Sequence, residues 1–296
     1  MSFDPLAYAI PLFVALIVAE LLWSWRKHNL GAYETRDTAL SLAFGLGSTL
    51  AGALSAGLVA AMLFALHDWA PLSLGWAWWA WPLCFVLDDL AYYVFHRSAH
   101  RVRWFWASHV NHHSSQHYNL STALRQSWTG FLALSFVFRL PLAAAGFEPE
   151  MILACGTFNL IYQFWIHTEA IGTMPRWFEA VMNTPSHHRV HHAINPRYLD
   201  RNFAGTLIIW DKLFGTFAAE SRHERARYGI VHQLGSFNLL YCVFHEWIGI
   251  ARDVWRAPLR HKLSYIWREP GWSHDGSRET SDMIRARWEN QHSKPD

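Results

Sequence analysis

Histidines at helical spacing are the residues of this 296-residue chain best suited to chemistry. Eleven of the 19 histidines lie between positions 96 and 192. The clusters are His96 and His100; His109, His112 and His113; and His187, His188, His191 and His192, with His117 and His167 between the last two clusters. Residues three or four apart share one face of a helix, and imidazole is the commonest protein ligand of transition metals. Nine or ten such ligands exceed the needs of one four-coordinate ion and suit two metals at one centre.

Polar residues on the same predicted helices accompany these histidines. One helical stripe, with steps of four, three and four, is Asp89, Tyr93, His96 and His100. We expect Asp89 and Tyr93 to hydrogen-bond the ligand N–H groups and so to orient the rings. Gln163 and His167 form a further pair four residues apart. Our predicted catalytic residues are therefore Tyr93, Asp89 and Gln163.

The last histidine cluster has the signals of its own short helix. Thr184-Pro185 resembles an N-cap followed by proline in the first turn, and Asn195-Pro196 predicts the end. Such a helix presents three histidines on one face, namely His188, His191 and His192. His187 is a further candidate ligand, whereas His117 is expected at the surface or facing the substrate.

The ligand types limit the metal and the reaction. The three cysteines lie in apolar stretches without a C-x-x-C pair, so we expect buried thiols. An all-nitrogen ligand set suits iron, zinc, copper or nickel. The sequence contains no H-E-x-x-H motif, which disfavours a zinc protease. Two redox metals beside a membrane suit O₂ activation for breaking an unactivated C–H bond of a lipid. A net charge of +2 gives no case for nucleic acid as a partner.

Long apolar runs predict the elements that carry the histidines. Hydrophobic residues make up 52% of the chain, and runs of about 18 or more suggest membrane spans. The runs cover residues 8–25, 38–66, 71–87, 128–147 and 151–166. The last run is short, so half of a re-entrant hairpin is an alternative to a full span.

Basic residues predict how these spans are oriented. Residues 26–37 and 88–127 carry arginine or lysine, whereas the links 67–70 and 148–150 carry none. All histidine clusters fall on the positive side, which predicts a cytosolic site. We therefore expect an all-α, multi-pass integral membrane bundle with a His-rich cytosolic cap that holds a dimetal centre. Residues 1–250 would form this domain. Residues 251–296 would form a polar, basic tail, which either lies on the membrane surface or is disordered.

The three histidine motifs among membrane spans resemble the fatty acid hydroxylase superfamily, which includes sterol desaturases. The resemblance covers residues 76–217 and, more weakly, the tail at Pro270-Gly271-Trp272. The segments that carry it are DDLAYY at 88–93, HHSS at 112–115, YNLSTALRQS at 118–127, QFWIHT at 163–168, NTPSHHRVHH at 183–192 and NFAGTLIIWDKLFGTF at 202–217.

The resemblance implies an integral membrane, non-haem enzyme with two iron ions (Fe²⁺/Fe³⁺). It implies nine metal ligands: His96, His100, His109, His112, His113, His167, His188, His191 and His192. The most similar branch hydroxylates the carbon beside the ether oxygen of glycerol ether lipids with O₂ and tetrahydrobiopterin, and a fatty aldehyde is released. Two departures are His117, where an acidic residue is expected, and Gln163, where other hydroxylases have histidine. The first departure bears on whether a pterin is used, and the second on how the ligand set of the second metal is completed.

Several alternatives stay open at this point. The same centre could hydroxylate or desaturate a fatty acid, sterol or carotenoid. A metal transport or storage protein is a rival from another class, although transport sites lie in mid-membrane and these clusters flank the spans. No cytochrome or ferredoxin sequence is fused, so we expect a separate electron donor, a pterin or a redox protein. Tyr118, Arg125 and Gln126 are candidates to bind glycerol hydroxyls.

Overall fold

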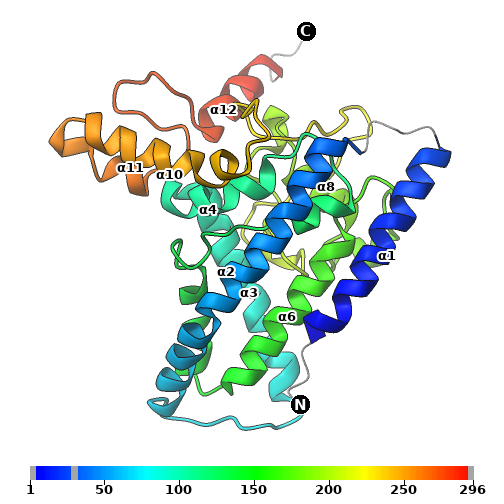
Figure 1. Ribbon diagram of the computed structural model, residues 1–296, viewed down its shortest axis with the longest axis vertical. Coiled ribbons are helices and arrows are strands. Elements are labelled where there is room, and N and C mark those ends of the chain that lie inside the picture. Colours follow the sequence, from blue (N-terminus) through cyan, green and yellow to red (C-terminus); the bar gives the residue numbers. More distant parts are fainter. Residues whose placement is uncertain (1–4, 28–32, 293–296) are drawn as a thin grey trace.

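A computed structural model describes residues 5–27 and 33–292 of the chain. Figure 1 shows a bundle of long helices with shorter helices gathered at one end. The predicted all-α class is confirmed, because the described residues contain helices and two isolated β-bridges but no strand.

Two N-terminal helices match the first two predicted spans. They are α1 (Pro5–Arg26) and α2 (Thr35–Asp68), and both are long and apolar enough to cross a membrane. The Glu34 side chain caps α2 by accepting from the amide of Asp37. Within the most apolar window of each helix, only 22% of α1 and 6% of α2 is buried. A core helix of a soluble protein would bury one face, so this exposure points to lipid as the surroundings.

The third predicted span is only partly helical. Residues 71–79 form turns, with Gly75 in the left-handed region, and α3 (Ala80–Arg101) begins nine residues later than expected. It then continues past the apolar run and carries the first two histidines beyond it. The prediction placed the span too early because hydropathy does not register the turn after Pro71.

The fourth predicted span is wrong as a single helix. Residues 128–147 instead contain the 3₁₀ helix η3 (Ser135–Arg139) and the short α5 (Leu140–Ala144). Leu134 adopts a left-handed backbone, with φ 56°, which breaks helical continuity. The fifth run is one helix, α6 (Pro149–Trp165). Its 17 residues extend about 26 Å at 1.5 Å each, less than the roughly 30 Å of a hydrocarbon core.

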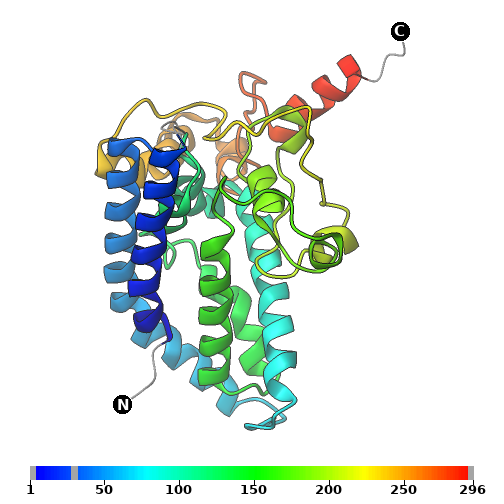
Figure 2. The ribbon, with the colours of Figure 1, turned by 90° about the vertical axis from the view of Figure 1, so that its right-hand side faces the viewer.

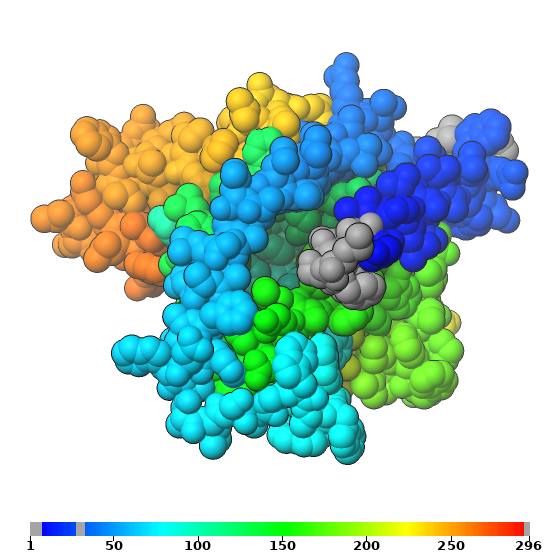
Figure 3. All heavy atoms as spheres, turned by 60° about the horizontal axis from the view of Figure 1, so that its bottom comes forward, coloured from blue at the N-terminus to red at the C-terminus, as the bar shows by residue number. Residues whose placement is uncertain are grey.

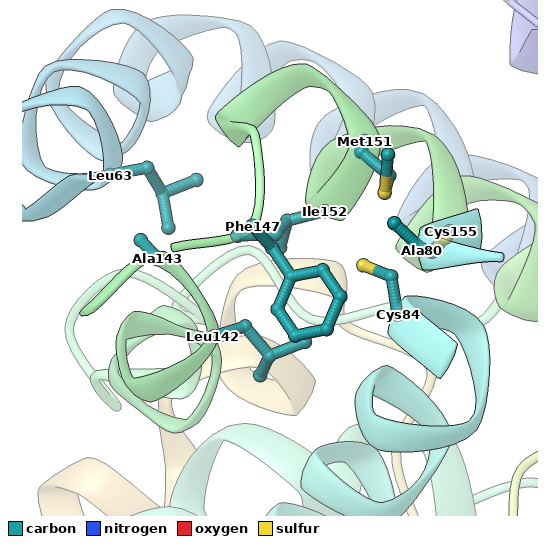
Figure 4. Close-up of a cluster of buried hydrophobic side chains, with 9 residues drawn as sticks. All are labelled: Leu63, Ala80, Cys84, Leu142, Ala143, Phe147, Met151, Ile152 and Cys155. Carbon is teal, nitrogen blue, oxygen red and sulfur yellow. The ribbon is translucent and has the colours of Figure 1, made fainter. Parts of the chain in front are cut away.

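A buried apolar cluster joins α2, α3, α5 and α6 at the end of the bundle away from the histidines (Figure 4). Its members are Leu63, Ala80, Cys84, Leu142, Ala143, Phe147, Met151, Ile152 and Cys155. All three cysteines are free and buried, as expected. Beside the cluster, Arg139 pairs with the fully buried Asp88 at 2.5 Å, so neither charge is left uncompensated.

Short elements form a cap on the opposite end. They are α4 (Arg103–His113), η2 (Leu120–Leu124), α7 (Arg176–Glu179), α8 (Pro185–His191), η4 (Pro196–Tyr198) and α9 (Ile209–Leu213). Figures 1 and 2 show this cap where α1 ends, α2 begins, and α3 and α6 end. The positively charged segments therefore gather at the histidine end, while the links 67–79 and 145–148 lie at the other end.

The C-terminal segment folds onto the cap. Its elements are α10 (Leu239–Arg256), η5 (Leu259–His261), α11 (Ser264–Trp267) and α12 (Ser281–His292). α10 packs on α4 and runs across residue 250, where we predicted a boundary. Arg103 of α4 pairs with Glu246 at 2.6 Å and with Asp253 at 2.7 Å. The tail up to residue 292 is thus ordered, which excludes the disordered alternative for that part.

Candidate metal centre

The nine predicted ligands come together as two groups of histidines. The first group is His96, His100, His109, His113 and His191, and the second is His112, His167, His188 and His192. Within each group, one ring nitrogen of every residue lies within 4.8 Å of those of all the others. The first group draws on α3, α4 and α8, and the second on α4, the turn after α6, and α8 with its C-cap.

Ring nitrogens converge at the separation that a metal requires. His167 Nε2 lies 3.1 Å from His112 Nε2 and 3.0 Å from His188 Nε2, and His192 Nε2 lies 3.2 Å from His188 Nε2. Metal–nitrogen bonds of about 2.0–2.1 Å put ligand nitrogens roughly 3.0–3.4 Å apart at right-angled or tetrahedral positions. The second group therefore fits one transition metal.

The first group shows the same convergence. His109 Nε2 lies 2.9 Å from His96 Nε2 and 3.0 Å from His113 Nε2. The Nε2 atoms of His100 and His191 are buried and have no hydrogen-bond partner. Because an orphaned buried nitrogen is costly, a ligated metal is the natural partner for both.

Burial fixes the protonation state of these rings. Desolvation, followed by repulsion from neighbouring histidines, holds the pKa of His109, His113 and His192 well below the usual range. Burial also lowers the pKa of His167 to about 4. These four imidazoles are therefore neutral at neutral pH, which is the form that donates a lone pair to a metal.

The two groups share helices and lie side by side. His112 and His113 are consecutive on α4 but belong to different groups, because successive helical residues point about 100° apart. His191 and His192 divide in the same way. The rings of His113 and His192 stack across the groups with centroids 4.4 Å apart. The two groups are therefore adjacent, and each could hold one metal ion.

Backbone carbonyls hold several ligands from behind. Nδ1 of His96 bonds the carbonyl of Phe203 at 2.7 Å, and Nδ1 of His191 bonds that of Arg201 at 3.0 Å. His167 donates in the same way to the Gln163 carbonyl at 2.7 Å. Each bond places the proton on Nδ1 and leaves Nε2 for a metal.

Asp89 and Tyr93 were predicted to hydrogen-bond the ligand rings, but neither side chain contacts a ring nitrogen of these histidines directly. Asp89 is buried and accepts from the amides of Thr206 and Leu207, from the indole of Trp210 and from the Asn159 amide. Tyr93 shares its hydroxyl with Thr216 at 2.9 Å. Both residues therefore hold residues 206–216 in place. The carbonyls of the neighbouring Arg201 and Phe203 orient the ligand rings. A catalytic role for either stays a prediction.

Gln163 and His187 also lie beside the centre. The Gln163 amide donates to Asn159 at 2.9 Å, which joins it to the Asp89 network. His187 belongs to neither group; its ring packs on Phe217, and its Nε2 lies 3.9 Å from Glu179. The catalytic role of Gln163 stays a prediction, and the structure does not bring His187 into a ligand set.

The three side chains suggested for glycerol hydroxyls are occupied within the fold. Arg125 is buried and donates to Asp37 at 2.8 Å, Tyr118 donates to the Ile166 carbonyl at 3.1 Å, and Gln126 donates to a backbone carbonyl of η2. That suggestion is therefore not supported.

Sequence reasoning missed a carboxylate that supports the centre. Glu20 of α1 accepts from the hydroxyls of Tyr33 and Thr168 and from the amide of Leu120. Thr168 follows the ligand His167, so this carboxylate ties α1 to the second group. The available signal was a single charge inside an otherwise apolar run.

Asp200 is the other missed carboxylate, and it touches a ligand directly. His100 Nδ1 donates to Asp200 Oδ1 at 3.2 Å, and Arg101 lies 3.5 Å from the other oxygen. Asp200 adopts φ 54° in the loop after η4. A carboxylate behind a ligating histidine raises its basicity and fixes its orientation.

We expect Asp200→Asn to weaken metal binding at the first group about 10- to 100-fold, the usual effect of losing such a partner. Asparagine keeps the size and tolerates the left-handed backbone, so unfolding should be unaffected. Metal titration with a competing chelator measures the change. Unaltered affinity, or equal weakening at both groups, would contradict this role.

A cavity of about 400 Å³ reaches the centre from the cap side. Its inner wall includes His100, His113, His191 and His192. Its outer walls come from α4, residues 229–234, α10 and the tail between residues 270 and 284. The first histidine group therefore has access to a space of ligand size.

Comparisons with known proteins agree with this site. Residues 81–216, which contain all nine histidines, match the sequence model of the fatty acid hydroxylase family. This segment of the chain is similar to that family. It is 41% identical to alkylglycerol monooxygenase of Danio rerio and 40% identical to that of Homo sapiens, over 90% and 91% of this chain.

The chain spans about three fifths of those two relatives, 59% and 60% of their length. A more distant relative is an ornithine lipid hydroxylase of Rhizobium tropici, 24% identical over 75% of this chain and 67% of that protein. No solved structure matches the chain.

Proposed function

We propose that this chain is a multi-pass membrane monooxygenase that oxidises lipid at a di-iron centre, with alkylglycerols as its substrate class. The observation that carries this proposal is the pair of adjacent buried histidine groups with converging ring nitrogens. The names of the relatives point to the same chemistry.

The nine histidines would hold the two irons, five at one position and four at the other. Iron with O₂ supplies the oxidising power that breaks an unactivated C–H bond, which no acid or base in this chain can do. The protein contributes buried imidazoles and carbonyls that fix their orientation. No carboxylate belongs to either group among the described residues, so the ligand set is all nitrogen.

We propose that the helices α1, α2, α3 and α6 cross or enter the membrane and that the metal centre lies on the cytosolic side. The exposed apolar surfaces of α1 and α2 support the first part. Basic residues concentrated at the histidine end support the second. A metal transport site would lie along a path within the spans, whereas this centre lies at the ends of α3 and α6.

An ether lipid suits the position and chemistry of the centre. The C–H bond beside an ether oxygen is weakened, because the oxygen lone pair stabilises a carbon radical. A lipid whose tail stays among apolar helices can bring that head-proximal carbon to the membrane surface, where the cavity meets the first group. Hydroxylation there gives a hemiacetal, which separates into a fatty aldehyde and glycerol. A separate donor, tetrahydrobiopterin or a redox protein, would supply the electrons.

We expect the iron-loaded protein to release fatty aldehyde from an alkylglycerol in the presence of O₂ and a reduced pterin. Gas chromatography of the aldehyde measures this, and a monoacylglycerol of equal chain length, which lacks the ether, is the matched control. Hydroxylation of a fatty acid, sterol or carotenoid without any aldehyde from the ether, whatever the donor, would favour the broader hydroxylase activity instead.

A further inference from the structure

The segment from α10 to α11 carries two apolar faces, and the protein covers only one of them. Cys242 and Val243 are fully buried against Leu40 and Phe44 of α2. On the opposite side lies a run of exposed large side chains: Leu240, Phe244, Ile248, Trp255, Leu259, Leu263 and Trp267. We call these residues the lateral face. Leu240, Phe244, Ile248 and Trp255 lie on one side of α10, at steps of four and seven. The exposed Leu259, Leu263 and Trp267 follow after α10 ends at Arg256. Trp255 and Leu259 are each 85% exposed.

The charges of this segment are unevenly distributed. It contains four basic residues, Arg252, Arg256, Arg260 and Lys262, and a fifth, Arg268, follows directly after α11. Its two acidic residues, Glu246 and Asp253, are both paired with Arg103 on the cap side. No ion pair engages the five basic residues within the parts of the chain that the structure describes. The lateral face is therefore bordered by free positive charge.

The position of the segment fits the edge of a membrane. Figures 1 and 2 both show α10 at the histidine end of the bundle, where α2 begins, and its direction crosses that of the long helices. Figure 3 shows the same segment extending sideways beyond α2. Because Leu40 and Phe44 lie in the first turns of α2, their contact fixes α10 at the level where α2 would enter the lipid.

We propose that the lateral face lies at the boundary between headgroups and acyl chains of the leaflet on the histidine side, and that its basic border binds anionic lipid headgroups. This rests on the membrane embedding that forms part of the proposed function. An amphipathic helix buries apolar side chains at that boundary, and arginine and lysine are attracted to anionic lipid. Exposed apolar side chains also line α2, among them Leu42, Leu46 and Leu50.

The opposite side of α10 gives this contact a consequence for the metal centre. Tyr241, His245 and Glu246 of α10 line the cavity that reaches the first histidine group. One helix therefore separates the lipid boundary from that cavity. Lipid held along the lateral face would lie next to the wall of the site.

Fluorescent probes on single introduced cysteines test the depth of the lateral face. The three native cysteines are buried, so an exposed thiol can be labelled selectively. The full chain is reconstituted in nanodiscs that contain shallow or deep spin-labelled lipids, with probes on Leu259→Cys and on two controls. Leu54→Cys lies on the exposed part of α2, and Met283→Cys lies on α12.

We expect the shallow spin-labelled lipid to quench the probe at position 259 and the deep one to quench the probe at position 54. Neither lipid should quench the probe at position 283. Quenching at 54 without quenching at 259 overturns this inference but leaves the membrane embedding intact. Loss of quenching at both positions overturns both. The emission of the probe at 259 could instead shift to the blue in proportion to protein concentration and independently of lipid. That result would mean that a second copy covers the lateral face, which also overturns the inference.

The charge border has its own test. Spin-labelled phosphatidylglycerol should quench the probe at 259 more strongly than spin-labelled phosphatidylcholine. The combined variant R252Q, R256Q, R260Q and K262Q should abolish this difference, whereas R222Q with R225Q, at exposed arginines elsewhere on the cap, should keep it. Equal quenching by the two lipids in the unaltered protein contradicts recognition of anionic lipid.

Discussion

His191→Ala is expected to remove metal from the first histidine group and to leave the second group loaded, while His112→Ala should do the reverse. Each substitution deletes one converging nitrogen from a different group. Oxygenase activity should be abolished in both variants, a larger loss than the roughly 10- to 100-fold caused by losing a hydrogen-bonded partner of a ligand. Iron analysis of the purified protein should show about half of the metal in either variant, since each group holds one position.

His223→Ala is the matched control, because this histidine is exposed and belongs to neither group. It should retain all of its iron and activity. The double variant at positions 112 and 191 should retain none. Full metal content in both single variants would show that the two groups are not the metal centre.

Asp89→Ala is expected to destabilise the protein most among substitutions outside the ligand set. The carboxylate accepts four hydrogen bonds, from Thr206, Leu207, Trp210 and Asn159. Four buried donors left unpaired at roughly 1–3 kcal/mol each cost about 4 kcal/mol or more. Because the same loop holds the Phe203 carbonyl against a ligand ring, the first histidine group should also lose metal.

Thermal unfolding in detergent and iron analysis together check this result. Asp89→Asn retains one acceptor oxygen and should lie between the alanine variant and the unaltered protein. Asp68→Ala, an exposed aspartate at the far end of the bundle, should change neither quantity. An unchanged unfolding midpoint for the alanine variant would mean that the loop is held by other contacts, such as those of Asp211 to the amides of Phe203 and Ala204.

Two of the predicted spans show where hydropathy succeeds and where it fails. The run 38–66 became the single helix α2, because nothing in it interrupts backbone hydrogen bonding. The run 128–147 is apolar apart from Arg139, yet Leu134 adopts a left-handed backbone and Arg139 pairs with Asp88. Composition measures transfer to lipid, whereas the backbone path here depends on a partner 51 positions away.

The nine candidate ligands were predicted from the sequence, by the spacing of the histidines together with the resemblance to a known family. Spacing of three and four residues puts imidazoles on one helical face, which is a local property that needs no knowledge of the fold. All nine predicted ligands appear in the two groups. Thr184 and Pro185 likewise start α8 where the capping signals predicted.

Only the tertiary structure decided how those ligands are divided and held. His112 and His113 are neighbours in the chain, and their separation into two groups depends on which helices face each side of α4. The carbonyls of Arg201 and Phe203 orient ligands without any side-chain signature. Spacing along a helix fixes which rings share a face, but the partners behind those rings come from a distant loop, and packing alone brings them together.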